Sequence, residues 1–148
     1  MGRPVAWRLA HALLAIWIGA MIAQAFVGAP LVFGAVPEHI ATKDSAARVI
    51  GPGFARIDML GVIASAILIA VYAARGVARS WRGALAFLLL IGAAVDAFVI
   101  APAIIARTEP LRVYHGTATA IWMTAIIVGV VLLLVPQAGE KDPARYDG

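Results

Sequence analysis

Apolar residues in this chain form long, nearly continuous runs. Four runs reach the length of about 20 residues that a helix needs to cross the hydrocarbon core of a bilayer. They cover residues 7–33, 54–74, 84–105 and 113–135. None shows the alternation typical of membrane barrel strands, and a helix satisfies its own backbone hydrogen bonds in lipid. The pattern therefore predicts an all-α integral membrane protein with four transmembrane helices in an antiparallel bundle.

The longest connection lies between the first two runs. Pro37 and the apolar positions Ile40, Ala47 and Ile50, with charged residues between them, predict a short amphipathic helix on the outer surface. The sequence Gly51-Pro52-Gly53 is expected to break this helix before the second span. Residues 1–136 then form one transmembrane domain, and residues 137–148 form a polar cytoplasmic tail.

The first run has a second interpretation. Arg3 and Arg8 precede it, and Ala23-Gln24-Ala25 resembles the cleavage site of a signal peptide. The apolar run continues well past that site to Phe33, however. We therefore expect the segment to be a transmembrane helix.

Composition supports a membrane protein. Of the 148 residues, 63% are hydrophobic and 14% are charged, whereas soluble domains have about 45–50% and about 25%. The net charge of +4 arises from Lys and Arg that flank the apolar runs. We therefore expect the lipid bilayer to be the partner, and we do not expect binding of nucleic acid. The chain has no cysteine and carries none of the common catalytic motifs, so we do not expect an enzyme.

The distribution of basic residues predicts the orientation in the membrane. Lys and Arg concentrate in the cytoplasmic loops of membrane proteins. Seven of the twelve lie at the termini or between the second and third runs, namely Arg3, Arg8, Arg75, Arg79, Arg82, Lys141 and Arg145. The remaining five would lie on the other side. We therefore expect both termini in the cytoplasm.

Each predicted helix has one strongly hydrogen-bonding side chain in the same outer half of the membrane. These side chains are Gln24, Asp58, Asp96 and His115. Because polar and charged groups in lipid usually face the bundle interior and pair, we expect Asp58 beside His115. Arg107 or Arg112 would reach Asp96 from the outer loop.

Two interpretations of these polar residues stay open. In the first, they form a pocket that binds or conducts a proton, a cation or a small ligand. In the second, they form hydrogen bonds between helices that only fix the packing register. Trp17 and Trp122 fall near the middle of the bilayer and either fill the core or hold a flat apolar ligand.

The histidines suggest two possible cofactors, haem and copper, although the sequence requires neither. His11 and His115 open helices on opposite sides of the membrane, so they cannot ligate one haem iron together. His39 and His115 share a side, so a haem held by these two stays a minor alternative, with His39 on a loop. A copper site of His39, His115 and Met59 is chemically allowed, because imidazole and thioether groups suit copper.

Small residues four positions apart suggest further partners. Gly19 with Ala23, and Gly61 with Ser65, allow helices to approach closely. They serve packing inside the bundle, a homodimer interface, or contacts in a larger membrane complex. An accessory structural subunit is therefore the alternative to a binding or permeation protein.

Several short motifs resemble a known membrane family. They are Trp17-Ile18-Gly19, residues 25–33, residues 46–54, Ala101-Pro102-Ala103-Ile104 and His115-Gly116. Their order and spacing resemble the four-helix family of transmembrane protein 205 and the domain of unknown function 4149. The start of the first helix, Arg8-Leu9-Ala10-His11, is also similar to the membrane domain of copper resistance protein D. The resemblance implies a four-helix membrane fold without an agreed biochemical activity, located in the cytoplasmic membrane of a bacterium.

Overall fold

Four helical rods make up the described part of the chain. The computed structural model describes residues 3–34, 43–107 and 110–135. The first rod consists of α1 (Arg3–Ala23), the π-helical segment η1 (Gln24–Gly28) and α2 (Ala29–Gly34), and the second is α3 (Lys43–Ala74). The third consists of α4 (Trp81–Val95), η2 (Asp96–Ile100) and α5 (Ala101–Ile105), and the fourth is α6 (Leu111–Leu134).

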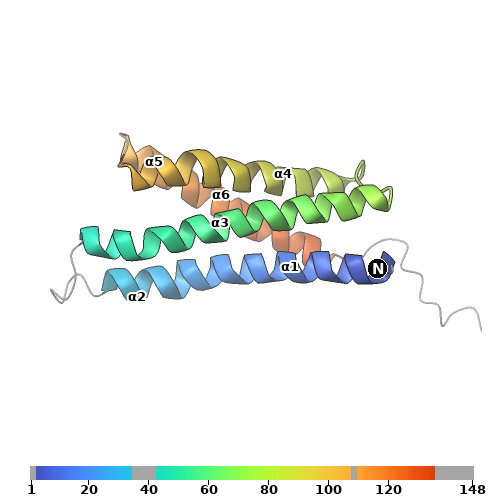
Figure 1. Cartoon of the computed structure of the whole chain (residues 1–148), viewed down its shortest axis with the longest axis horizontal. Coiled ribbons are helices and arrows are strands. Elements are labelled where there is room, and N and C mark those ends of the chain that lie inside the picture. Colours follow the sequence, from blue (N-terminus) through green and yellow to red (C-terminus); the bar gives the residue numbers. More distant parts are fainter. Residues whose placement is uncertain (1–2, 35–42, 108–109, 136–148) are drawn as a thin grey trace, which may run out of the picture.

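The rods form an up-and-down bundle (Figure 1). Helix α1 packs against α3 and α6, and α4 packs against the same two helices, so α1 lies diagonally opposite α4 and α3 opposite α6. All four rods are long and apolar enough to cross a membrane. The predicted all-α membrane fold is therefore confirmed.

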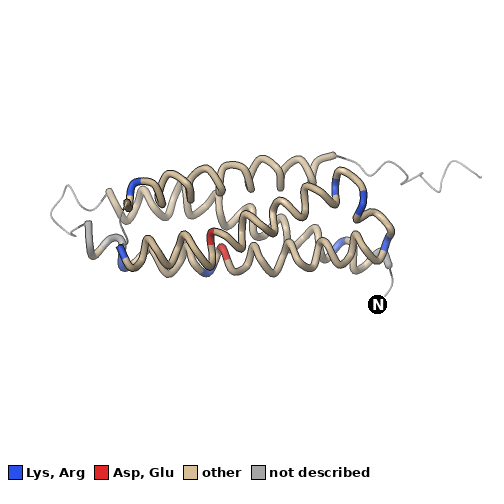
Figure 2. The backbone as a smooth tube through the Cα atoms, turned by 90° about the horizontal axis from the view of Figure 1, so that it is seen from above, with Lys and Arg blue, Asp and Glu red and all other residues tan. Residues whose placement is uncertain are grey.

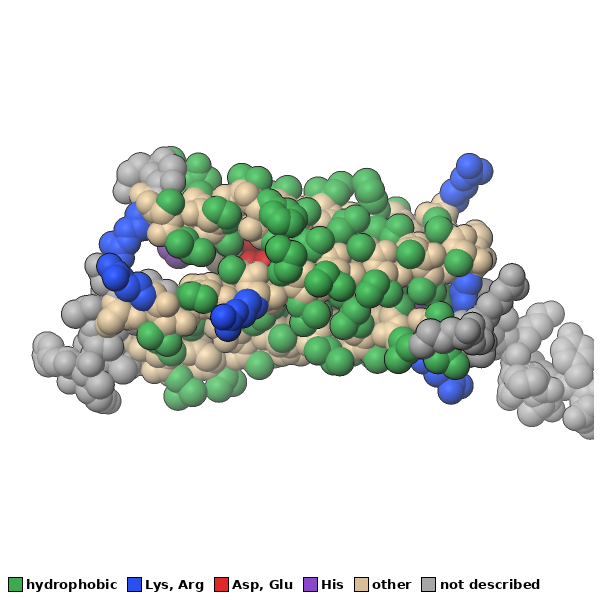
Figure 3. Space-filling model, in the orientation of Figure 1, with side chains coloured by type: hydrophobic (Ala, Val, Ile, Leu, Met, Phe, Trp, Pro, Cys, Tyr) green, Lys and Arg blue, Asp and Glu red, His purple; other side chains and the backbone are tan. Residues whose placement is uncertain are grey.

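The core of the bundle is narrow, as expected for a protein in lipid. Trp17, Tyr72 and Leu68 are fully buried between the rods, whereas Leu31 and Leu134 are 71% and 74% exposed. The apolar surface covers the length of the bundle (Figure 3). Such a surface is stable only where acyl chains replace water.

Both π-helical segments occur where a proline follows. A proline ring crowds the carbonyl group four residues earlier, and membrane helices relieve this crowding by local π-helical adjustments. Pro30 and Pro102 stand two residues after η1 and η2. The amide N–H groups of Ala29 and Ala101 bond to carbonyls five residues back, those of Gln24 and Asp96. The wider turns therefore lie at Gln24 and Asp96.

The expected break at Gly51-Pro52-Gly53 is wrong, because α3 runs through these residues without interruption. The helical segment that begins at Lys43 is thus part of the second rod. Residues 37–42 of the predicted amphipathic helix lie outside the described residues, and so does the tail 137–148. Gly53 permits close packing against η1: a β-carbon there would lie 3.2 Å from Nε2 of Gln24. Close packing between helices therefore explains the glycine at position 53 better than a break in the helix does.

Gly61 allows α1 and α3 to approach closely. A β-carbon at Gly61 would collide with the indole ring of Trp17. We expect Gly61→Ala to lower the free energy of unfolding by about 1–3 kcal/mol, because the ring of Trp17, which is only 1% exposed, would have to shift within the core. Reversible unfolding in mixed micelles measures the effect.

Gly116→Ala is the matched control, since a β-carbon at that helical glycine meets no atom within 4 Å. We expect this variant to keep or slightly raise the stability, as alanine favours a helix over glycine. Equal losses in the two variants would contradict the packing explanation.

Candidate functional site

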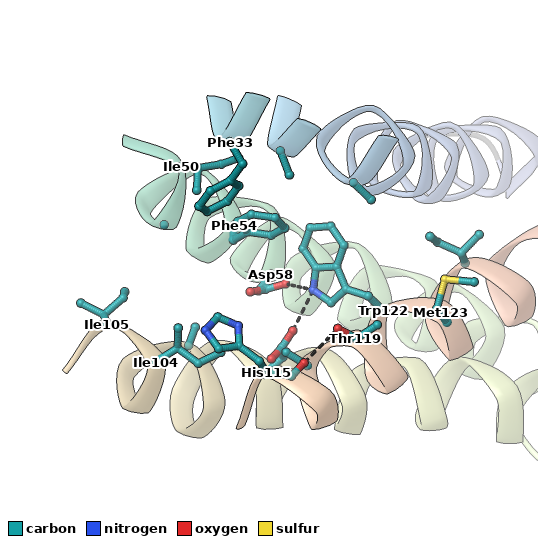
Figure 4. A pocket seen from close by; sticks show the side chains of 17 residues that line it. Phe33, Ile50, Phe54, Asp58, Ile104, Ile105, His115, Thr119, Trp122 and Met123 are labelled. Carbon is teal, nitrogen blue, oxygen red and sulfur yellow. Dashed lines mark hydrogen bonds between the residues drawn. The ribbon is translucent and has the colours of Figure 1, made fainter. Parts of the chain in front are cut away.

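Two buried carboxylates share one hydrogen-bond donor inside the bundle. The indole Nε1–H of Trp122 donates to Oδ1 of Asp58 at 2.9 Å and to Oδ2 of Asp96 at 2.7 Å (Figure 4). The side chains of Asp58 and Asp96 are only 3% and 2% exposed. Their positions lie side by side on neighbouring rods, whereas most Lys and Arg positions lie near the ends of the bundle (Figure 2).

Each of the three residues comes from a different rod. Asp58 lies on α3, Asp96 begins η2, and Trp122 lies on α6. Because α3 and α6 are diagonally opposite, their backbones do not approach each other closely, and long side chains connect them. The ring of Trp122 reaches across and packs against Phe54 of α3, with ring centroids 4.8 Å apart. The indole therefore joins the two diagonal helices through both packing and hydrogen bonds.

A cavity of about 350 Å³ adjoins this group. Asp58, Asp96 and Trp122 line it together with His115, and the rest of its wall is almost entirely apolar. Figure 4 shows the second oxygen of Asp58 pointing toward the space between Phe54 and His115. None of the described residues that line the cavity is Lys or Arg. The cavity is therefore an apolar chamber with two acidic groups in its wall.

The structure thus brings Asp58, Asp96 and His115 to one cavity. His115 is exposed and lies near the start of α6, and its backbone carbonyl accepts a hydrogen bond from Thr119 Oγ1 at 2.9 Å. The hydrogen-bond partner of Asp58 is Trp122, where we expected His115. His115 and the carboxylates therefore share a wall without pairing directly.

Gln24 lies elsewhere, at the contact between the first two rods. Its side chain lies against Gly28 and Gly53, where an added β-carbon would come within 2.6 Å and 3.2 Å of its amide atoms. It does not line the cavity. We grouped Gln24 with the carboxylates because it has a similar depth in the membrane. It lies, however, on the face of its helix that is turned toward α3.

Of the four residues predicted to support the pocket, only one lies at the cavity. Trp122 forms the centre of the site, whereas Trp17 is buried in the core against Gly61. Arg107 and Arg112 do not line the cavity. Arg107 adopts a left-handed conformation, with φ of 56°, in the turn after α5. The expected arginine partner of Asp96 is therefore replaced by the indole of Trp122.

The candidate metal ligands do not form a cluster within the described residues. His39 lies outside these residues, and Met59 is 41% exposed and does not line the cavity. His11 lies in a separate group, with its ring 4.2 Å from that of Trp7 and 6.2 Å from that of Tyr72. Tyr72 lies near the C-terminal end of α3, whereas the residues of α3 that line the cavity lie between Ile50 and Asp58. His11 and His115 are therefore at opposite ends of the bundle.

A short repeat marks the two π-helical positions. Residues 24–30 and 96–102 share five of seven residues, the pattern Ala-Phe-Val followed by Ala-Pro after one intervening residue. In each copy the first residue is polar, Gln24 or Asp96, and begins a π-helical segment. This repeat could have indicated the special backbone around Asp96. No comparable signal distinguished the role of Trp122.

The fold and cavity define a helical integral membrane protein with an acidic chamber inside its bundle. The chain belongs to the family described as Domain of unknown function (DUF4149), whose match covers residues 12–112. The matched region contains Asp58 and Asp96 but ends before His115 and Trp122. No curated protein and no solved structure matches the chain.

Removal of the shared donor should destabilise the bundle. Trp122→Phe keeps an aromatic ring but leaves both buried carboxylates without the indole N–H. We expect its free energy of unfolding to fall by about 1–3 kcal/mol more than that of Trp17→Phe, because unsatisfied buried polar groups are costly.

Trp17→Phe is a suitable control, since its buried Nε1 has no hydrogen-bond partner among the described residues. Both substitutions remove the same atoms from a buried ring. Chemical unfolding in micelles compares them, and an equal or smaller loss in Trp122→Phe would show that the shared hydrogen bonds contribute nothing.

Proposed function

We propose that this protein is a binding protein of the membrane, whose cavity takes up one positive charge on the Asp58–Asp96 pair. The observation that carries the proposal is the convergence of two buried carboxylates on one neutral donor. Polar groups that serve packing alone need no adjoining chamber, whereas here both carboxylates line a cavity of about 350 Å³. Intramembrane carboxylates commonly mark ion or substrate sites.

Electrostatics supports a positive occupant. A hydrogen bond from an indole stabilises a carboxylate but supplies no positive charge. Two neighbouring carboxylates repel each other strongly where water is excluded, and a proton or cation between them removes most of that repulsion. Binding of one positive charge is therefore the simplest chemistry that the site supports.

The position of the site along the bundle suggests the side of the membrane from which a positive charge reaches the carboxylates. From the distribution of Lys and Arg we infer that both termini lie in the cytoplasm and that the cavity lies in the outer half of the membrane. The family resemblance suggests that this membrane is the cytoplasmic membrane of a bacterium. The resemblance to transmembrane protein 205 and to copper resistance protein D adds no activity to this proposal.

The indole N–H of Trp122 offers a direct readout of charge at the pair. We expect its nuclear magnetic resonance signal to shift as the pH of a detergent or nanodisc sample is lowered, because a proton added to either carboxylate changes both hydrogen bonds. In the double variant Asp58→Asn and Asp96→Asn this shift should be absent, since amides do not titrate. Each Asn keeps a carbonyl oxygen that accepts the indole hydrogen bond.

The indole signal of Trp17 serves as an internal control, because no titratable partner is bonded to its Nε1 in the described residues. A Trp122 signal that is independent of pH in the wild-type protein would contradict the proposal. That result, with stoichiometric co-purification of other membrane proteins, would favour the alternative of an accessory structural subunit.

A further inference from the structure

We propose that the occupant of the cavity is a lipophilic organic ammonium ion that enters from the side of the bundle facing the bilayer. This inference rests on the proposed function and names its ligand. Three features of the structure support it: the size of the cavity, the chemistry of its wall and the place where it opens.

The size of the cavity indicates an organic ligand. A volume of about 350 Å³ is within the range of small-molecule sites and equals roughly a dozen times the volume that one water molecule occupies in the liquid. A proton or a bare metal ion would leave nearly all of it unfilled. A molecule of roughly ten non-hydrogen atoms fits this space.

The chemistry of the wall indicates an amine with an apolar body. Asp58 and Asp96 accept hydrogen bonds from an ammonium group, and Phe54 and Trp122 place aromatic rings beside the same point (Figure 4). Carboxylates and aromatic faces together recognise organic cations. Phe33, Ile50 and Ile104 then surround the apolar part of the ligand. An anionic ligand would meet two carboxylates without a Lys or Arg in the described lining.

The opening of the cavity indicates where the ligand comes from. Helix α2 packs against α3 and η1 but not against α6, whereas α3 keeps its contact with α5, so the first and fourth rods separate at this end. Figure 3 shows a hollow on the long side of the bundle near α5, in which histidine and acidic side chains are visible. In a membrane this side faces acyl chains. A ligand that partitions into lipid therefore reaches the carboxylates without crossing the apolar core.

Binding of three matched compounds tests the ligand class. Phenylbutylamine, phenylbutanol and phenylbutyrate share one apolar body and carry a positive, a neutral and a negative group. Equilibrium binding is measured on the full chain in phosphatidylcholine nanodiscs, with partitioning into empty nanodiscs subtracted. We expect the amine to bind roughly tenfold or more tightly than the alcohol, the difference that charged hydrogen bonds supply, and the carboxylate not to bind.

Two variants connect this binding to the cavity. The double variant Asp58→Asn and Asp96→Asn should remove the preference for the amine over the alcohol. Ala118→Phe, which fills space in the lining, should weaken the amine and the alcohol alike. Ala15→Phe is the control for Ala118→Phe, because Ala15 is exposed on α1 and its substitution should leave binding unchanged.

The source of the ammonium group is resolved by lipid composition. If added phosphatidylethanolamine displaces phenylbutylamine, the lipid headgroup is the natural source; if it does not, the source is a free amine. Equal binding of amine and alcohol to the wild-type protein would overturn the inference. Should the Trp122 signal still respond to pH in that case, a proton site would remain; if it does not, the proposed function fails as well.

Discussion

The placement of Asp58 and Asp96 at the cavity depends on the hydrogen bonds that the indole of Trp122 donates to both of them. A bundle of four apolar helices gains little from the hydrophobic effect inside lipid, because acyl chains are as apolar as leucine side chains. Directed contacts therefore matter more for the relative placement of its helices. Trp122 bonds to α3 and η2 at once, so one side chain fixes three rods although the backbones of the diagonal pair do not approach each other closely.

The same end of the bundle is shaped by two prolines. Pro30 and Pro102 follow π-helical segments in two copies of one short sequence, and π-helical turns are frequent at functional sites. In the third rod this wider turn begins at Asp96 and turns its carboxylate inward. In the first rod it begins at Gln24, which is used for contact with α3. One backbone feature thus serves a site in one rod and packing in the other.

The far end of the molecule has a different role. Trp7 stacks on Tyr72 with ring centroids 5.2 Å apart, and the Arg75 guanidinium lies 4.7 Å from the centre of the Trp7 ring. Aromatic and basic side chains of this kind prefer the boundary between lipid and water. Together with the buried contact of Gly129, they make this end tightly packed. The open cavity and the closed core therefore occupy separate parts of the bundle, so a ligand at the carboxylates need not disturb the core.

The sequence by itself determined the class of fold, since helix length and apolar character are set by the thickness of the bilayer and need no knowledge of neighbours. It also selected Asp58 and Asp96, because an acidic residue within an apolar span is conspicuous and is expected to face the interior. Depth along a helix, however, does not give the direction in which a side chain points. Gln24 has a comparable depth but faces α3, and Trp122 looked like any core ring until three helices were placed around it. The tertiary structure alone decided these points, because hydrogen-bond partners on different helices are fixed by helix rotation and packing, which no local pattern records.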